Sequence, residues 1–299
     1  MNRSAEWTRL LTAPATTTVD PGARHRVGRR LVAAVREVVD GLPPGEQVVV
    51  TLPIVRKAHL RPDLLRVPDE PFGWKPIFVR RSLGLAVVAA CADGRMRTPA
   101  EAVGPVAAEA VAEWGRTGWR THHWEPWFAG LTPGAQAMVL AEAASWATSL
   151  WCSFEWATLG PLAQVGGLDD QWTSPAPRPV RLKARSELQV PLMTAGQPSW
   201  EGEPGRPAVA LVVLSSGIPG DGWEEELSYV ALVAALRSPA RPVPSRVMGL
   251  WPDAGRHHAV EIDEGALNRA ADRVVSTVSA LVDVGVPGGR ESVTSVGRA

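Results

Sequence analysis

The residues with the clearest chemical potential lie at alternating positions in one short segment. Lys183, Arg185 and Glu187 are two residues apart, so their side chains would share one face of a β-strand. A carboxylate can bind Mg²⁺, the cation can activate a water that attacks a phosphodiester, and a lysine can stabilise the charge that develops. If the chain cleaves phosphodiesters, Glu187 is the candidate metal ligand and Lys183 the candidate catalytic cation. A solvated sheet face would explain Lys183 and Arg185 equally well.

A second metal ligand would have to come from elsewhere in the chain. A helix is predicted from Thr132-Pro133 to about Trp156, and it carries Glu155 close to the segment with the alternating charges. Glu155, or Glu142 on the same helix, is therefore the candidate partner of Glu187 in a metal site. A solvated helix surface or a local salt bridge is the alternative for both residues.

Arginines could supply DNA-binding contacts, because guanidinium groups bind phosphates. The candidates are Arg24, Arg26, Arg29, Arg30, Arg80, Arg81 and Arg185. Formal net charge is zero, with 31 basic and 31 acidic residues, so any affinity for DNA must come from a local patch. A salt-bridged or solvated helix face is the alternative.

The order of predicted elements favours a mixed α/β fold. Helices are expected at 24–39, 223–237 and from Asp263 onwards, and strands at 47–52, 180–190, 207–214, 246–251 and 258–262. Three further segments are expected to be a loose arm (1–20), a strand followed by a short helix (77–91) and a loop (159–179). Seven tryptophans between 114 and 156 are expected to lie in the core.

The second half of the chain resembles the RecB-like PD-(D/E)XK nuclease superfamily. The family has a strand with a Gly-Arg-x-Asp-like segment, then a strand with Asp-x-Lys-(Thr/Ser)-Gly, then a helix with Gln-x-x-x-Tyr. The matching positions here are Ala184-Arg185-Ser186-Glu187-Leu188, then Val213-Leu214-Ser215-Ser216-Gly217, then Glu225 and Tyr229. Residues 251–262 resemble the closing hairpin of the family, and 263–282 resemble its last helix.

The resemblance departs from the family where the chemistry would be done. Val213 stands at the metal-binding aspartate, Ser215 at the lysine and Glu225 at the glutamine, while Glu187 can replace the first acid. The resemblance therefore implies a restriction-endonuclease-like core with a degenerate active site.

These observations predict three parts: a mainly helical N-terminal region (1–130), a nuclease-like core (131–286) and a disordered tail (287–299). The first functional hypothesis is a catalytically inactive nuclease-like accessory factor that binds DNA or a partner protein and needs no cofactor. The second is an active Mg²⁺-dependent DNase, an endo- or exonuclease with relocated catalytic groups. The third is a structural subunit of a larger assembly.

Composition bears on the cellular location of the protein, on its source and on its cysteines. The longest apolar run, 83–92, is shorter than the roughly 20 residues of a membrane helix, so we expect no membrane contact and a cytoplasmic location. Many alanines and arginines with only three lysines are typical of GC-rich bacterial genes. Cys91 and Cys152 lie in apolar stretches and are expected to be buried free thiols.

Overall fold

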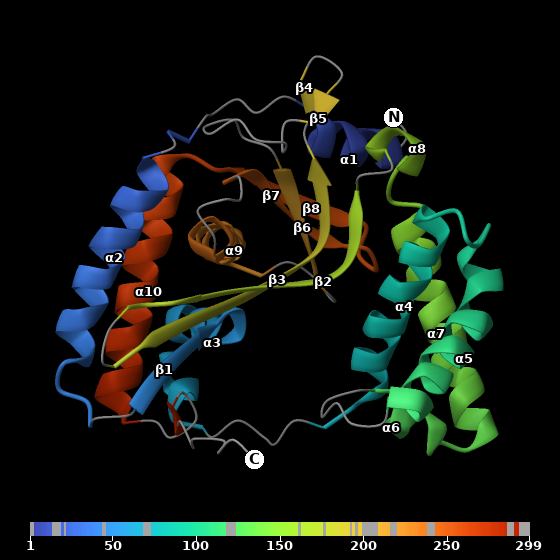
Figure 1. The fold of residues 1–299 in the computed structure, drawn as a ribbon, viewed down its shortest axis with the longest axis horizontal. Helices are drawn as coiled ribbons and strands as arrows, with labels where there is room; N and C mark the ends of the chain where they lie inside the picture. Colours follow the sequence, from blue (N-terminus) through green and yellow to red (C-terminus); the bar gives the residue numbers. More distant parts are fainter. Residues whose placement is uncertain are drawn as a thin grey trace.

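The computed structural model describes residues 3–13, 19–20, 22–43, 46–67, 73–117, 124–160, 163–175, 178–191, 193–194, 197–198, 209–215, 220–237, 243–285 and 290–292 of the chain. Within these residues the protein is an α/β fold with a mixed sheet of seven strands, flanked by helices (Figure 1). The predicted fold class is confirmed, including the helical N-terminal region.

The large sheet has the strand order β8-β7-β6-β3-β1-β9, and β2 pairs with β3 in addition. Its strands are β1 (Glu46–Thr51), β2 (Gln164–Thr173), β3 (Val180–Pro191), β6 (Val209–Leu214), β7 (Pro244–Trp251), β8 (Arg256–Glu261) and β9 (Arg290–Ser292). Two short strands, β4 (Met193–Thr194) and β5 (Gln197–Pro198), form a separate ribbon. Strand β6 runs antiparallel to β3 and parallel to β7, and β7 and β8 form an antiparallel hairpin.

The expected neighbourhood of the two central strands is confirmed. Strand β3 carries Glu187, and its residue Leu188 lies opposite Val212 of β6. The connection from β6 to β7 contains α9 (Trp223–Arg237), as a parallel pair of strands requires a crossover. The segment into residue 214 is thus a central strand beside the one that bears Glu187.

Two layers of helices cover the sheet. The first layer contains α2 (Ala23–Val39), α3 (Leu52–Leu60), α9 and α10 (Glu264–Val284). The second contains α1 (Arg3–Thr12), α4 (Pro76–Ala92), α5 (Pro99–Thr117), α6 (Glu125–Ala129), α7 (Pro133–Trp151) and α8 (Trp156–Leu159). Strand β6 serves both hydrophobic cores, because Leu211 and Val213 pack into the first and Val212 and Leu214 into the second. Burial on both faces explains why this strand is continuously apolar.

Sequence signals at two helix starts are confirmed. The Thr132 hydroxyl accepts a hydrogen bond from the Ala135 N–H at 3.3 Å, and the Asp263 carboxylate accepts one from the Ala266 N–H at 2.6 Å. Such caps satisfy N–H groups that the first turn of a helix leaves without a partner. They fix the starts of α7 and α10.

Three predicted segments were wrong. The expected arm contains α1, because Trp7 and Leu11 are four residues apart and are buried on one side of a helix. Residues 77–91 form the single helix α4 rather than a strand and a helix, since an apolar run has no periodicity that separates the two. The expected loop at 159–179 contains β2, whose polar residues are ordered by pairing with β3.

Smaller corrections concern the cysteines, the tail and the N-terminal region. Cys91 is buried as expected, but Cys152 is exposed after the last turn of α7. Residues 290–292 of the expected disordered tail form β9, which pairs with β1. Strand β1 precedes residue 130 and yet pairs with β3, so the predicted boundary does not divide the sheet from the N-terminal region.

Candidate functional site

The sheet is split along one edge of β3, and this split creates a pocket. Strand β1 pairs with the first part of β3 in parallel, up to Thr51 opposite Lys183. Strand β6 pairs with the last part in antiparallel fashion, from Pro191 back to Leu188. Because β2 pairs with both parts, β1 and β6 must share the other edge. Their carboxyl ends therefore approach each other beside the middle of β3, the kind of place where open α/β sheets bind ligands.

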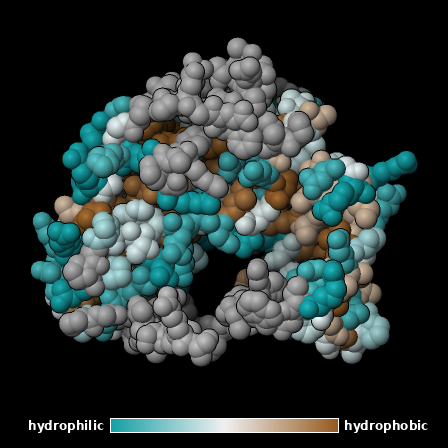
Figure 2. Space-filling model, viewed as in Figure 1, coloured by the Kyte–Doolittle hydropathy of each residue, from teal (hydrophilic) through white to brown (hydrophobic). Residues whose placement is uncertain are grey.

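A pocket of about 440 Å³ opens at this split, and we call it the cleft. Figure 2 shows the molecule hollowed beneath β2 and β3, between α3 and α4, with hydrophilic residues along its upper edge. The described residues that line the cleft are Thr51, Leu52, Pro53, Arg56, Arg81, Asp169, Asp170, Gln171, Lys183, Ala184, Arg185, Glu187, Val213, Leu214 and Ser215.

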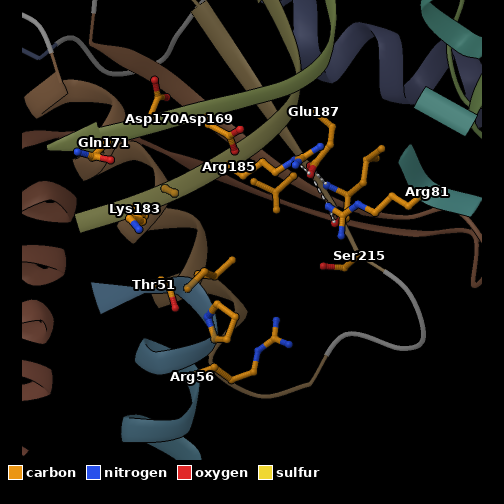
Figure 3. A pocket seen from close by; sticks show the side chains of 15 residues that line it. Thr51, Arg56, Arg81, Asp169, Asp170, Gln171, Lys183, Arg185, Glu187 and Ser215 are labelled. Carbon is orange, nitrogen blue, oxygen red and sulfur yellow. Dashed lines mark hydrogen bonds and ion pairs between the residues drawn. The ribbon is translucent and has the colours of Figure 1, made fainter. Parts of the chain in front are cut away.

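Lys183, Arg185 and Glu187 all line the cleft, so the predicted shared face is confirmed. Figure 3 shows Arg185 and Arg81 converging on Glu187 from opposite sides. Arg185 lies opposite Asp169 of β2 in the strand register. A side chain at Gly167, in the irregular part of β2, would collide with the Arg185 guanidinium, so this glycine provides the space that Arg185 occupies.

Glu187 is fully buried, and both of its carboxylate oxygens have partners. Arg81 donates from Nη2 to Oε1, the Arg185 Nε lies 3.5 Å from the same oxygen, and the Leu214 N–H donates to Oε2 at 2.8 Å. Arg81 Nη2 also donates to the Leu214 carbonyl at 2.7 Å. Arg81 therefore ties β3 to the end of β6.

Burial raises the pKa of Glu187 above its ordinary value, because the charged form loses its hydration. Arg81, the Leu214 N–H and Arg185 oppose this shift, in that order. The site thus combines a desolvated carboxylate with two guanidinium groups that compensate it.

Other charged residues of the cleft are anchored by the first core layer. Arg56 of α3 forms a paired contact with Glu226 of α9. Asp170 points to the other side of β2, where Arg237 of α9 donates to it (Figure 3). Asp169 remains on the cleft side, beside Arg185.

Tyr229 closes the split from within α9. Its hydroxyl contacts the Val50 carbonyl at 2.8 Å and the Lys183 carbonyl at 3.1 Å, and so bridges β1 and β3. Burial raises the pKa of this phenol, so it stays neutral. The tyrosine singled out by the resemblance has a structural position beneath the cleft.

The remaining motif positions are dispersed. Val213 and Ser215 line the cleft, and the Ser215 N–H donates to the Leu250 carbonyl at 2.9 Å. Glu225 lies outside it, 4.0 Å from Arg273 of α10. Ser216 and Gly217 lie outside the described residues.

The structure does not bring Glu155 to Glu187. The Glu155 N–H donates to the Thr8 hydroxyl of α1 at 2.8 Å, and Glu155 is not among the residues that line the cleft. Within the described ranges, no three or more His, Cys, Asp or Glu side chains are grouped so that they could hold a metal. The residues that could offer a cation two carboxylates in the cleft are Asp169 and Glu187.

The predicted DNA-binding arginines separate into different environments. Arg81 and Arg185 line the cleft, and Arg80 lies 3.6 Å from Asp253. On α2, Arg26 pairs with Asp20 and Glu264, and Arg30 pairs with Asp272. Arg24 and Arg29 line a second pocket beside the same helix.

Sequence reasoning missed Arg56 and Gln171 as cleft residues, and it assigned Asp169 to the expected loop at 159–179. Arg56 follows β1 by one helical turn, and no spacing in the sequence links it to β3. Asp169 and Gln171 alternate on one face of β2, a signal that the glycines beside them concealed.

Comparisons with known proteins add little. No family model matches the chain, and no curated protein does. A solved structure described as "Crystal structure of SSO0001" is similar with a TM-score of 0.28 and 10% identity, over 88% of this chain and 97% of that one. A likeness at this level supports no statement about fold or function. No described helix has the length and apolar character needed to cross a membrane.

Proposed function

We propose that the chain is a non-catalytic relative of the RecB-like nucleases that binds DNA through the cleft. The order of elements supports the kinship. A strand with Glu187 lies antiparallel to β6, α9 follows with Tyr229, and the β7–β8 hairpin leads into α10. This is the succession that the resemblance implies.

The observation that carries the loss of catalysis is the environment of Glu187. Its two oxygens accept hydrogen bonds from Arg81 and the Leu214 N–H. A cation at this carboxylate would have to displace donors that already compensate its charge. The neighbouring strand offers Val213 and Ser215, and neither supplies a carboxylate.

The same contacts favour phosphate binding. The side chains of Arg56, Arg81 and Arg185 remain 50%, 39% and 46% exposed while each is held by a carboxylate. A guanidinium has five N–H donors, so an anchored arginine can still bind a phosphate with its orientation already fixed. Lys183 adds a fourth cationic group to the wall.

Fluorescence anisotropy with a labelled single strand and its duplex, at low salt, tests the proposal. We expect both to bind, with an affinity that falls as salt rises. Arg185→Gln should weaken binding to both and lower the salt slope by about one. Arg256→Gln, an exposed change on β8 outside the cleft, serves as the control. Binding that is absent at low salt, or equal in the two variants, would contradict DNA binding by the cleft.

A metal-dependent DNase is the second candidate, because Asp169, Glu187 and Lys183 line the same cleft. Incubation of DNA with the protein and Mn²⁺ or Mg²⁺ tests it, with Asp169→Asn and Glu187→Gln as paired variants. Cleavage that both variants abolish would replace the non-catalytic proposal with this one. DNA that stays intact beside a binding-competent protein would exclude it.

A further inference from the structure

A second pocket lies on the opposite face of the β2–β3 ribbon from the cleft. In the strand register Gln171 pairs with Lys183 and Trp172 pairs with Leu182. Gln171 and Lys183 line the cleft, whereas Trp172 and Leu182 face the core beneath α2 and α9. Trp172 borders a pocket of about 410 Å³, which we call the α2 pocket. This volume lies within the range of about 300–1,000 Å³ that small-molecule sites occupy.

The wall of the α2 pocket combines cations with an aromatic ring. The described residues that line it are Arg24, His25, Gly28, Arg29, Val32, Trp172, Pro175 and Leu236. No aspartate or glutamate is among these described residues, so the wall has a positive electrostatic character. Trp172 is only partly buried and offers part of its indole to the pocket.

The amino end of helix α2 forms part of the wall. Arg24 and His25 stand in its first turn, and the Asp20 carboxylate just before the helix accepts a hydrogen bond from the Gly22 N–H at 3.1 Å and pairs with Arg26. The attraction for an anion therefore comes from the guanidinium groups that line the pocket.

Two other arginines of α2 form ion pairs with acidic residues. Arg26 and Arg30 are neutralised by Asp20, Glu264 and Asp272 at the contact with α10. Arg29 is exposed and lies along the α2 pocket. The helix thus uses Arg26 and Arg30 for packing and presents Arg29 beside Trp172.

Gly28 lies at the floor of the pocket, where α2 meets α9. A Cβ atom at this position would lie 3.1 Å from Leu236 Cδ2. The missing side chain therefore allows α9 to approach α2 at the floor of the pocket, which Gly28 and Leu236 both line.

We propose that the α2 pocket binds an aromatic base that carries a phosphate, with the base on Trp172 and the phosphate on Arg24 and Arg29. An aromatic base stacks on an indole, and guanidinium groups bind phosphate with strong, charge-assisted hydrogen bonds. The ligand is a free nucleotide or a nucleotide of an unpaired strand, since both present this chemistry. The proposal does not depend on DNA binding in the cleft.

Isothermal titration calorimetry of the full chain with AMP, adenosine and ribose 5-phosphate at low salt tests the two halves of the ligand. We expect AMP to bind, and each fragment to bind at least about tenfold more weakly, because each fragment lacks either the stacked base or the charged hydrogen bonds of the phosphate. Ribose 5-phosphate that binds as tightly as AMP would remove the base from the proposal and overturn it.

Variants assign the site. Arg29→Gln and Trp172→Leu should each weaken AMP binding about tenfold. Arg36→Gln is the matched control, because Arg36 is an exposed arginine two turns further along the same helix and outside the pocket. Arg29→Gln changes an exposed residue and should leave folding intact even if Trp172→Leu destabilises the core.

Three further outcomes would overturn the proposal: no AMP binding, equal binding in Arg29→Gln and Arg36→Gln, or a loss caused by Arg185→Gln in the cleft. A 5′-phosphorylated single strand of about six nucleotides distinguishes the two sources. Tighter binding than AMP, still dependent on Arg29 and Trp172, identifies an unpaired strand. Equal or weaker binding identifies a free nucleotide.

Discussion

Two arginine–carboxylate contacts, one in the cleft and one on the surface between α2 and α10, differ in burial and therefore in the direction of their effect on the pKa. Glu187 is fully buried between Arg81 and the Leu214 N–H, and its pKa is raised. Glu264 is only partly exposed, accepts hydrogen bonds from Arg26 at 3.0 and 2.6 Å, and has a lowered pKa. Desolvation dominates the first contact and hydrogen bonding dominates the second. An arginine–glutamate contact thus accompanies a raised glutamate pKa in the buried cleft and a lowered one at the surface.

The largest effect should come from removing the buried carboxylate. Glu187→Ala leaves Arg81 and the Leu214 N–H without their acceptor, and breaking a buried pair costs about 3–5 kcal/mol. Because the Arg81 side chain is 39% exposed and can regain water, we expect a loss of about 2–3 kcal/mol. Urea unfolding measures it, and a change close to zero would mean that Glu187 is not buried as described.

Removing the Tyr229 hydroxyl, a neutral group between β1 and β3, should have an intermediate effect on the free energy of unfolding. Tyr229→Phe removes the hydroxyl that contacts the Val50 and Lys183 carbonyls. The expected loss of unfolding free energy is about 1–2 kcal/mol, since buried acceptors lose their donor. Amide hydrogen exchange of β1 should rise in parallel. Unchanged exchange in β1 would show that the hydroxyl does not hold the two strands together.

The raised pKa of Glu187 predicts the sign of a pH effect. A carboxyl group with a raised folded-state pKa binds its proton more tightly in the folded protein, so its contribution to stability falls as pH rises from about 4.5 towards the folded-state pKa. Glu187→Gln removes this pH-dependent contribution to stability, because an amide does not titrate. The stability of the variant relative to the parent should therefore increase with pH over that window in urea unfolding. A relative stability that decreases would contradict the raised pKa.

The smallest effect is expected at the surface contact. The lowered pKa of Glu264 means that its contribution is present above its ordinary pKa and is lost as pH falls through the folded-state value. Glu264→Gln should therefore lose relative stability as pH rises through the acid range, in the opposite direction to Glu187→Gln. The change should be small, because exposed ion pairs contribute little. If the relative stabilities of Glu187→Gln and Glu264→Gln changed with pH in the same direction, the two contacts would not differ as described.

Local patterns predicted much of this arrangement. Alternation placed Lys183, Arg185 and Glu187 on one face, and the continuous apolar run identified β6. The capping residues Thr132 and Asp263 identified two helix starts. Each of these signals depends on residues that are close in the sequence.

The rest of the cleft depends on contacts between distant segments. Arg81 reaches Glu187 because α4 packs against β2 and the arginine side chain extends to the Leu214 carbonyl at the end of β6. Arg56 is placed by the parallel strand pair that brings β1 to β3. Asp169 reaches the cleft because β2 pairs with β3. The glycines of β2 made this segment look like a loop in the sequence. Glu155, the expected metal partner, is not among the residues that line the cleft, and its N–H donates to Thr8 of α1.

The divided edge of β3 has a mechanical consequence. Among the described strands, only the β2–β3 ribbon carries backbone pairing from the half of the sheet with β1 to the half with β6. Arg56 follows β1 on one side of the cleft. Arg81 is hydrogen-bonded to Leu214, the last residue of β6, on the other side. Bending of the β2–β3 ribbon would therefore change the separation of the two guanidinium groups, and with it the width of the cleft.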